Sequence, residues 1–465
     1  MEPCAIDYTR AFAAELVAMD GAALTGRDLA QLDRLLLDYC GVAFGGAARP
    51  WIAALHGWAQ RYRGCGPARI IASDLEVPAE VAAFVNGAAG HSFELDDTHD
   101  SSMSHPGAVV IPASLAVASD VGADGPQVLA AIAAGYETMA RIGITVRAGR
   151  VIAAGFHPTA VLGVFGAATA AAKLLGFDAG QLCTAWGHAL SLAAGSMQFS
   201  QEPAGAEVKR LHAGYAARSG VTAAQMAQAG ISAPTRSLDG RYGFLALYGC
   251  DPDPAALLAP GARGLAIHDI SIKPYACCRL LHSMIDGLRD ATDGFTRGAE
   301  ISHILVRGPQ KLADQHMVVR PMTPMAAQYS LPFAAGAALA YGPDRFDVFE
   351  DPYLADPDIL GFADRVEVAS DTELERTYPA HFGTEVEVSF ADGQVRVRRV
   401  LDSIGTPLSP LPADRLAAKA RALVAQNRAD ADFGRIEDAV RALARAGSVV
   451  SLQAALSLPP GSGIG

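Results

Sequence analysis

The chain has 465 residues, of which 51% are hydrophobic and 18% are charged, and its formal net charge at pH 7 is -12. This length is too great for one ordinary hydrophobic core, so we expect two domains. The acidic balance disfavours nucleic acid as a partner, because phosphate-binding surfaces show clusters of lysine and arginine. The seven cysteines form no C-x-x-C pair, which excludes the usual zinc-ribbon spacing.

Targeting signals are not apparent in the sequence. The longest apolar stretches, such as 161–172, fall short of the roughly 18 to 20 residues that a bilayer span requires. The N-terminus carries an acid at Glu2 and lacks the basic start and apolar core of a secretory signal. We therefore expect no membrane partner and a cytoplasmic location.

The first 265 residues predict a helical domain. Ala-rich patterns with helical spacing, separated by Gly and Pro, occur at 29–43, 80–90, 127–143, 161–175, 178–196 and 213–230. A second helical region extends from 412 to 456. Both ends of the chain are therefore predicted to be helical.

The segment between these regions has a different pattern. Apolar and polar residues alternate at 266–273, 301–307, 365–369 and 384–390, as they do in half-buried strands. Helices are expected at 279–291 and 324–340, and a hairpin turn at Asp392-Gly393. The predicted fold class is mainly α: a large all-α helical domain formed by both chain ends (1–265 plus 401–465), with an inserted smaller α+β lid domain (266–400).

The stretch 86–109 concentrates titratable groups. Several of these groups are carboxylates, which repel one another at such short spacing. Burying a carboxylate that has no partner costs several kcal/mol. The segment is therefore either a solvated loop or a site. Its small-residue, Ala-rich flanks at 81–89 and 109–118 favour a site, because they predict buried helices. The groups in question are Glu94, Asp96, Asp97 and Asp100, together with His91, Thr98, His99 and His105.

Five separated motifs, in order, resemble the MmgE/PrpD family. This family includes 2-methylcitrate dehydratase of the PrpD type, cis-aconitate decarboxylase and iminodisuccinate epimerase. The resemblance spans roughly residues 10 to 400, and it rests on Asn86-Gly87 to His105-Pro106, Gly155 to Thr159, Val208 to Gly214, Ile272 to Tyr275 and Ala327 to Pro332.

The resemblance implies a homodimer of two-domain subunits, with an active site between the helical and lid domains and no metal or organic cofactor. Carried over from the decarboxylase branch, the catalytic residues are Thr98, His105, Lys209, Lys273 and an acid, which here is Glu94 where the family usually has Asp. One residue more also separates Thr98 from His105, and Cys278 stands where that branch has a histidine.

The expected chemistry is general acid/base catalysis on a small anionic carboxylate. A substrate with two or three carboxylates needs cations that neutralise charge in an enolate-like intermediate. Without a metal, a buried lysine can do this work and also exchange protons, because burial lowers its pKa. Further residues expected to contribute to substrate binding are Asp96, Asp97, His157, Arg210, His212, Tyr275, Cys278 and Arg279.

The sequence therefore predicts a cofactor-independent lyase that dehydrates or decarboxylates a di- or tricarboxylate. Two alternatives stay open: an isomerase or epimerase acting on an iminodisuccinate-like substrate, and a non-catalytic carboxylate-binding dimeric protein.

Each candidate residue also has a structural interpretation. His105-Pro106 could simply begin a helix, Asp96 and Asp97 could cap helices or hold the lysines, and Lys209-Arg210 could be a surface pair. For His157 and His212 we expect a structural or supporting role and not direct catalysis. A metal ion held by His91, His99 and His105 with the Asp96-Asp97 pair is disfavoured, because the spacing of the histidines fits no helical ligand pair.

Overall fold

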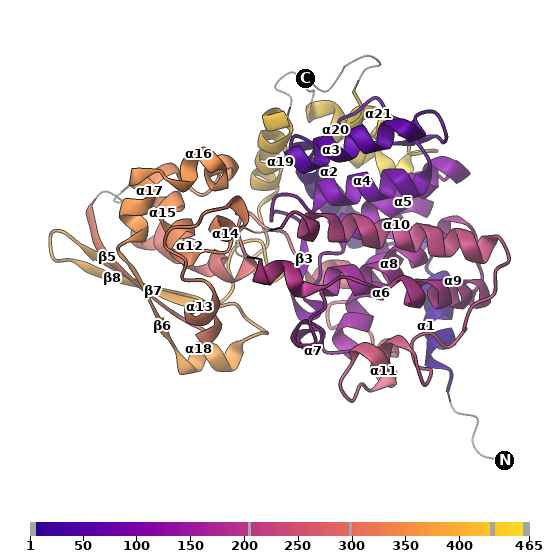
Figure 1. The fold of residues 1–465 in the computed structure, drawn as a ribbon, viewed down its shortest axis with the longest axis horizontal. Helices are drawn as coiled ribbons and strands as arrows, with labels where there is room; N and C mark the ends of the chain where they lie inside the picture. The colour runs from indigo at the N-terminus through magenta and orange to yellow at the C-terminus, as the bar shows by residue number, and fades with distance from the viewer. Residues whose placement is uncertain (1–5, 203–205, 297–299, 428–432, 459–465) are drawn as a thin grey trace.

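Helices from both ends of the chain pack together in the larger of two lobes, and the middle of the chain forms the smaller lobe (Figure 1). The computed structural model describes residues 6–202, 206–296, 300–427 and 433–458. Residues 1–5, from which we predict no secretory signal, lie outside the described residues. Within the described parts of the chain, no helix has the length and apolar character needed to cross a bilayer.

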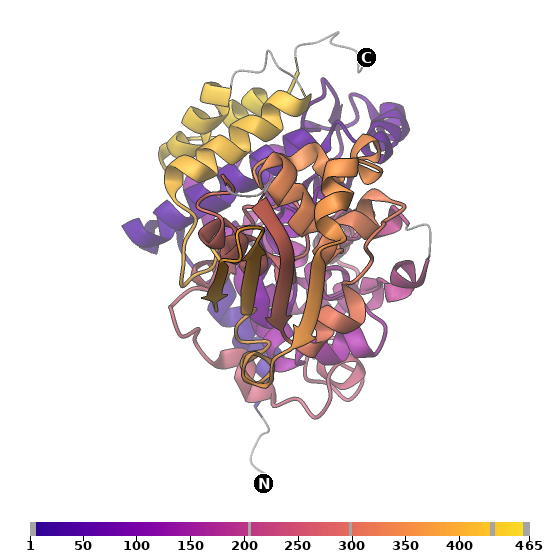
Figure 2. The same ribbon diagram turned by 90° about the vertical axis from the view of Figure 1, so that its left-hand side faces the viewer.

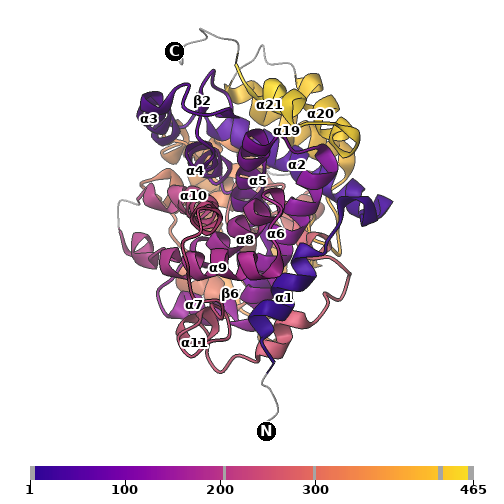
Figure 3. The ribbon, with the colours of Figure 1, turned by 90° about the vertical axis from the view of Figure 1, so that its right-hand side faces the viewer.

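The larger lobe is a bundle whose helices are crowded side by side in Figure 3. Three of its helices begin with a capping box, in which the side chain of the N-cap residue and that of the third helical residue each accept the other's backbone N–H. The helices are α1 (Tyr8–Val17), α2 (Gly26–Gly46), α3 (Pro50–Ala59), α4 (Ala79–Gly90), α5 (Gly107–Val121), α6 (Gly125–Thr145), α7 (Ala148–Ala153), α8 (Pro158–Leu174), α9 (Ala179–Leu192), α10 (Val208–Gln228) and α11 (Phe244–Tyr248), then α19 (Ala413–Asn427), α20 (Phe433–Ala442) and α21 (Val450–Leu456).

Close approach of α10 to α4 depends on glycine. A Cβ atom at Gly214 would lie 2.3 Å from the backbone oxygen of Phe84, and one at Gly87 would lie 2.9 Å from the Cα atom of Gly214. Only glycine fits at these two points without moving backbone. This contact brings the start of α10 next to the loop that follows α4.

The smaller lobe contains a four-stranded sheet, which faces the viewer in Figure 2. The strand order is β6-β5-β7-β8, with β5 parallel to β6 and antiparallel to β7, and β7 antiparallel to β8. The strands are β5 (Ile301–Gly308), β6 (Val366–Ser370), β7 (Thr384–Phe390) and β8 (Val395–Val400). The associated helices are α12 (His282–Ala291), α13 (Gln310–Gln315), α14 (Pro324–Gln328), α15 (Leu331–Tyr341), α16 (Asp351–Leu354), α17 (Pro357–Ala363) and α18 (Thr372–Thr377).

Three of the four predicted strands are confirmed, as is the hairpin turn, where Gly393 has a φ of 84°. The strand predicted at 266–273 is wrong over most of its length. Residues Ala266–Asp269 form a 3₁₀ turn and only β4 (Ile270–Ser271) is extended. Ile267, Ile270 and Ile272 pack in the apolar cluster of the larger lobe, and residues 270–273 are all buried. The alternation of residue types here therefore does not correspond to one buried and one exposed face of a strand.

The helix predicted at 324–340 is also interrupted. It divides into α14 and α15 because the Ser330 side chain caps a new helix by accepting a hydrogen bond from the backbone N–H of Phe333. Tyr329 lies at the break, as the C-cap residue of α14.

Buried apolar side chains form two clusters, one in each lobe. Helix α19 contributes to both, since Leu416 and Ala420 belong to the cluster of the larger lobe and Leu423 to that of the smaller lobe. Phe93 and Leu95, from the loop after α4, pack in the smaller lobe's cluster. The domain boundaries at 265 and 400 stay a prediction.

Candidate active site

A cavity of about 890 Å³ lies where three long helices begin. His105 precedes α5, His157 precedes α8, and Lys209 lies in the first turn of α10, and all three residues line the cavity. Helix N-termini carry partial positive charge and unpaired N–H groups, so they favour anions. The cavity therefore suits a negatively charged ligand even before its side chains are considered.

A short two-stranded ribbon brings the first and fourth predicted motifs together. Strand β3 (Thr98–His99) pairs antiparallel with β4, and Thr98 is opposite Ser271. Lys273 follows β4 by two residues, and the N–H of Ile272 donates to the carbonyl of Gly405. This pairing places Lys273 beside the cluster at 94–105, although more than 160 residues of sequence separate them.

Glu94 lies at the centre of three buried cations. Its Oε1 accepts a hydrogen bond from Arg210 Nη1 at 2.6 Å and contacts Lys209 Nζ, while its Oε2 lies 3.5 Å from Lys273 Nζ. Phe93 and Leu95 on either side pack into the smaller lobe, and Glu94 itself has a positive φ of 57°. The left-handed backbone turns the carboxylate toward the cations, a strained arrangement that non-glycine residues adopt mainly at functional sites.

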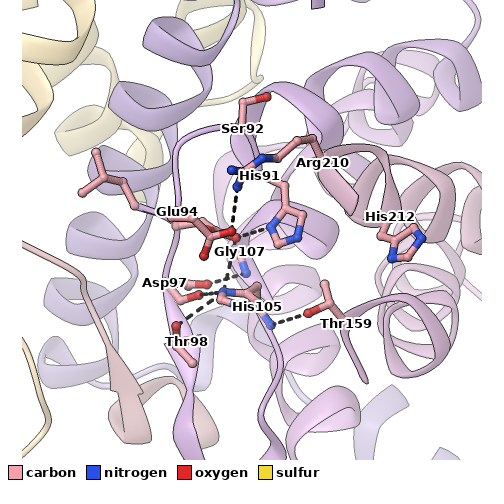
Figure 4. A network of polar contacts seen from close by, with 12 residues as sticks. His91, Ser92, Glu94, Asp97, Thr98, His105, Gly107, Thr159, Arg210 and His212 are labelled. Atoms are coloured by element: carbon pink, nitrogen blue, oxygen red, sulfur yellow. Dashed lines mark hydrogen bonds and ion pairs between the residues drawn. The ribbon is translucent and has the colours of Figure 1, made fainter. Parts of the chain in front are cut away.

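His105 is held by one ring nitrogen. Its Nδ1 lies 2.8 Å from the carbonyl oxygen of Asp97 and 3.4 Å from the hydroxyl of Thr98, and its backbone N–H donates to Thr159 (Figure 4). A carbonyl oxygen can only accept, so Nδ1 carries the hydrogen and Nε2 is the nitrogen available for chemistry. Burial lowers the pKa of His105; the Asp96 carboxylate opposes that shift and the Lys273 ammonium adds to it.

Lys209 and Asp96 have strongly shifted pKa values in this setting. Burial lowers the pKa of Lys209 well below its usual value, and the neighbouring Arg210 and Lys273 cations lower it further. Burial alone would raise the pKa of Asp96, but the His105 and His91 rings lower it below its usual range. Lys209 therefore gives up its proton more readily than an exposed lysine does, whereas Asp96 stays ionised.

Asp97 is anchored away from the cavity. Its Oδ1 accepts from the backbone N–H of Gly107, the first residue of α5, and its Oδ2 accepts from the hydroxyl of Tyr136 at 2.6 Å. A Cβ at position 107 would lie 2.7 Å from both Asp97 Oδ2 and the Tyr136 hydroxyl oxygen, so glycine is needed there. Asp97 therefore caps α5, as the structural alternative for this residue proposed.

We predict that Asp97→Asn retains activity and changes the pH dependence of stability. The Asn oxygen can accept from the Gly107 N–H and the Asn amide can donate to the Tyr136 hydroxyl oxygen, so kcat should stay within about tenfold of wild type. Burial raises the pKa of Asp97 to about 7, so its contribution to stability is largest below the unfolded pKa and is lost as pH rises toward 7. Thermal unfolding between pH 5 and 8 should therefore show a smaller decline for the variant, and an equal decline would contradict this role.

Three further histidines, His91, His157 and His212, form a chain of ring contacts that begins at His105. The Nδ1 atoms of His157 and His212 are 3.0 Å apart, and His91 Nδ1 lies 2.6 Å from Asp96 Oδ2. The ring centroids of His91 and His157 are 5.8 Å apart. Burial lowers the pKa of His157 well below its usual value and that of His212 to about 4, so these two rings are neutral and can share one hydrogen.

Cys278 lines the cavity, but two other predicted binding residues lie elsewhere. The Tyr275 hydroxyl donates to Asp286 at 2.5 Å inside the smaller lobe. Arg279 donates to Ser403 and lies 3.7 Å from an Asp100 carboxylate oxygen. Arg279 lines a second cavity of about 360 Å³ together with His99, the neighbour of Thr98. The alternative that Lys209 and Arg210 form a surface pair is wrong, since both are buried.

One group of side chains could hold a metal ion. His91, Asp96 and His105 each offer a ligand atom within 4.8 Å of the others, and all three belong to the set of side chains for which the sequence spacing disfavoured a metal site. The Nδ1 atoms of both rings already make hydrogen bonds to oxygen, at 2.6 Å to Asp96 and 2.8 Å to the Asp97 carbonyl. The arrangement suits proton-bearing imidazoles, and metal independence stays a prediction.

Residues from the smaller lobe complete the site and were given no role from the sequence. The Tyr329 hydroxyl lies 3.4 Å from Glu94 Oε2, and Lys209 Nζ lies 5.7 Å from the centroid of the Tyr329 ring. Gln328 accepts from Arg210 and donates to the carbonyl of Phe93. Both residues belong to the fifth motif. Polar side chains among small apolar residues in that motif are the sequence signal that could have identified them as site residues.

Comparison with known proteins agrees with this arrangement of motifs. The MmgE/PrpD N-terminal domain matches residues 12–256 and the MmgE/PrpD C-terminal domain matches residues 275–445. The chain is 27% identical to a cis-aconitate decarboxylase of Aspergillus terreus, over 91% of each chain. It is 25% identical to cis-aconitate decarboxylase of Homo sapiens and 26% to that of Mus musculus, over 89% of this chain and 87% and 86% of theirs. This chain belongs to the MmgE/PrpD family.

Proposed function

We propose that this protein is a lyase that decarboxylates a small unsaturated tricarboxylate of the cis-aconitate type without a cofactor. The observation that carries the proposal is the convergence of three buried cations, Lys209, Arg210 and Lys273, around Glu94. One of them, Lys209, lines the cavity together with His105. The relatives named cis-aconitate decarboxylases support the same reaction class. We also propose that it acts as a homodimer.

The reaction needs one proton and stabilisation of negative charge. When the carboxylate on the methylene carbon of cis-aconitate leaves as CO₂, the electron pair of the broken bond forms a new C=C bond. The electrons of the old double bond pass to the former vinyl carbon, which then takes one proton. The product is a dicarboxylate with a terminal methylene group. Cations near that carbon lower the barrier because charge develops there.

The side chains fit these requirements as follows. The three cations that now surround Glu94 would receive the substrate carboxylates and stabilise the carbanion. His105 would deliver the proton from Nε2, because Nδ1 is engaged by the Asp97 carbonyl. Burial lowers the pKa of His105, and a bound trianion acts in the opposite direction, so the ring takes up a proton as substrate binds.

The decisive test is proton NMR of the purified protein with cis-aconitate in heavy water. We expect two terminal methylene signals to appear and the saturated methylene of the product to carry one deuterium. EDTA should leave the rate unchanged. Citrate and 2-methylcitrate serve as comparison substrates: olefinic signals from either would indicate dehydration instead. Deuterium exchange into iminodisuccinate without net change would indicate epimerisation, and no change in any substrate would support a binding protein.

A further inference from the structure

A single buried lysine outside the cavity connects the two segments that carry the site. Lys419, on α19, is 5% exposed. Its Nζ donates to the backbone carbonyl of Leu95 at 2.8 Å and to the backbone carbonyl of Lys273 at 2.8 Å. The third acceptor is Asp38 Oδ1, on α2, at 2.7 Å. One ammonium group therefore uses all three of its hydrogens on three segments that are remote in sequence.

The two carbonyl groups belong to the backbone of the site itself. Leu95 lies between Glu94 and Asp96, and Lys273 is the residue whose Nζ faces Glu94. Both residues lie beside the β3–β4 ribbon, which has only two residue pairs, Thr98 with Ser271 and His99 with Ile270. A ribbon this short is marginal by itself, so other contacts must fix the distance between its flanking residues.

We propose that Lys419 is a positioning residue that sets the distance between Glu94 and Lys273, with Asp38 supplying its counter-charge. The inference rests on the proposed function, in which Lys273 is one of the cations that receive the substrate. A displacement of about 1 Å in such a group can reduce the rate on the order of a hundredfold. We call the hydrogen bonds from Lys419 Nζ to the carbonyls of Leu95 and Lys273 the Lys419 tie.

Removing Lys419 alone would leave Asp38 as an unpaired buried charge, which can unfold a protein. The test therefore compares Asp38→Asn with the double variant Asp38→Asn/Lys419→Met. Asp38→Asn keeps a side-chain oxygen that can accept from Lys419 Nζ, so it retains the Lys419 tie, and its Tm should fall because the buried ammonium loses its counter-charge. The double variant removes the tie together with both buried charges. Lys173→Met is a matched control, because Lys173 Nζ also donates to three backbone carbonyls, those of Leu16, Val17 and Met19, far from the cavity at the other end of α8.

The expected result is a selective loss of kcat. Relative to Asp38→Asn, the double variant should turn over cis-aconitate on the order of a hundredfold more slowly. Its Kd for tricarballylate, a saturated analogue, should change by less than about threefold, because the charges that bind the anion are still present. Lys173→Met should lower Tm without lowering kcat. Equal kcat in the single and double variants would overturn the proposal.

Hydrogen exchange measured by mass spectrometry supplies a readout that does not depend on activity. Removing the Lys419 tie should speed exchange in peptides covering 95–99 and 270–273, and Lys173→Met should speed it only around 16–23. If wild type turns over no carboxylate, the proposed function fails, but the exchange measurement still decides the positioning role. Unchanged exchange in both site segments would overturn it.

Discussion

His105→Asn is expected to abolish turnover while leaving the fold intact. The Asn side-chain amide can replace Nδ1–H as the donor to the Asp97 carbonyl, so the loop keeps its anchor. It cannot replace Nε2, the nitrogen that we assign to proton delivery. General acid catalysis contributes typically 10²- to 10⁴-fold, so kcat should fall by about that factor. Steady-state kinetics with cis-aconitate measures the loss, and Tm should change by only a few degrees.

The matched control for this variant is His99→Asn. His99 lies six residues earlier, is buried, and lines the second cavity instead of the first. Its Nδ1 accepts from the backbone N–H of Ser102, which the Asn carbonyl oxygen can do equally well. His99→Asn should therefore keep kcat near the wild-type value. Equal losses in the two variants would show that the loop, and not the Nε2 atom of His105, is what the reaction needs.

Glu94→Gln is expected to destabilise the free protein and to make it depend on bound anions. Three buried cations would lose their counter-ion, and breaking a buried ion pair in this way costs about 3 to 5 kcal/mol. A di- or tricarboxylate ligand can supply the missing negative charge. Tricarballylate should therefore raise the Tm of Glu94→Gln by more than it raises the Tm of wild type, because ligand binding to the folded state alone stabilises it.

Glu137→Gln serves as the comparison for this experiment. Glu137 is buried and accepts from Arg141 Nε at 2.7 Å and from the backbone N–H of Ala266, outside the larger cavity. Its replacement should lower Tm in a similar way, but tricarballylate should raise the Tm of this variant no more than that of wild type. If both variants respond equally to the ligand, the cations around Glu94 do not form the anion site.

Most of the local structure followed from sequence patterns. The helices of the larger lobe are long, rich in Ala and clearly punctuated by Gly and Pro, and strands β5, β6 and β7 alternate because one face of their sheet is buried. The errors fell at the junction of the lobes. Residues 270–273 are all buried, so the alternation of residue types did not mark one buried and one exposed face. The cap formed by Ser330 divided a helical pattern that looked continuous.

The sequence also determined which residue types the site would contain, since the density of charged groups at 94–105 and the basic residues Lys209, Arg210 and Lys273 are visible as motifs. Their division of labour was decided only in three dimensions. Asp97 and Asp96 are neighbours with the same side chain, yet Asp97 binds Gly107 and Tyr136 whereas Asp96 faces His91 and His105. Successive side chains of an extended loop point in opposite directions, and what each one meets depends on other segments.

Tertiary structure likewise separated Arg210 from Arg279, and it brought Tyr329 and Lys419 to the site region. Arg210 meets Glu94, while Arg279 turns to Asp100 and Ser403 on the other cavity. Lys419 looks in the sequence like any lysine of an amphipathic helix, because its three acceptors come from α2, from the loop after α4 and from the second residue after β4. Short-range patterns record whether a residue is buried, but the charges and carbonyls that it meets there are fixed only when distant segments pack together.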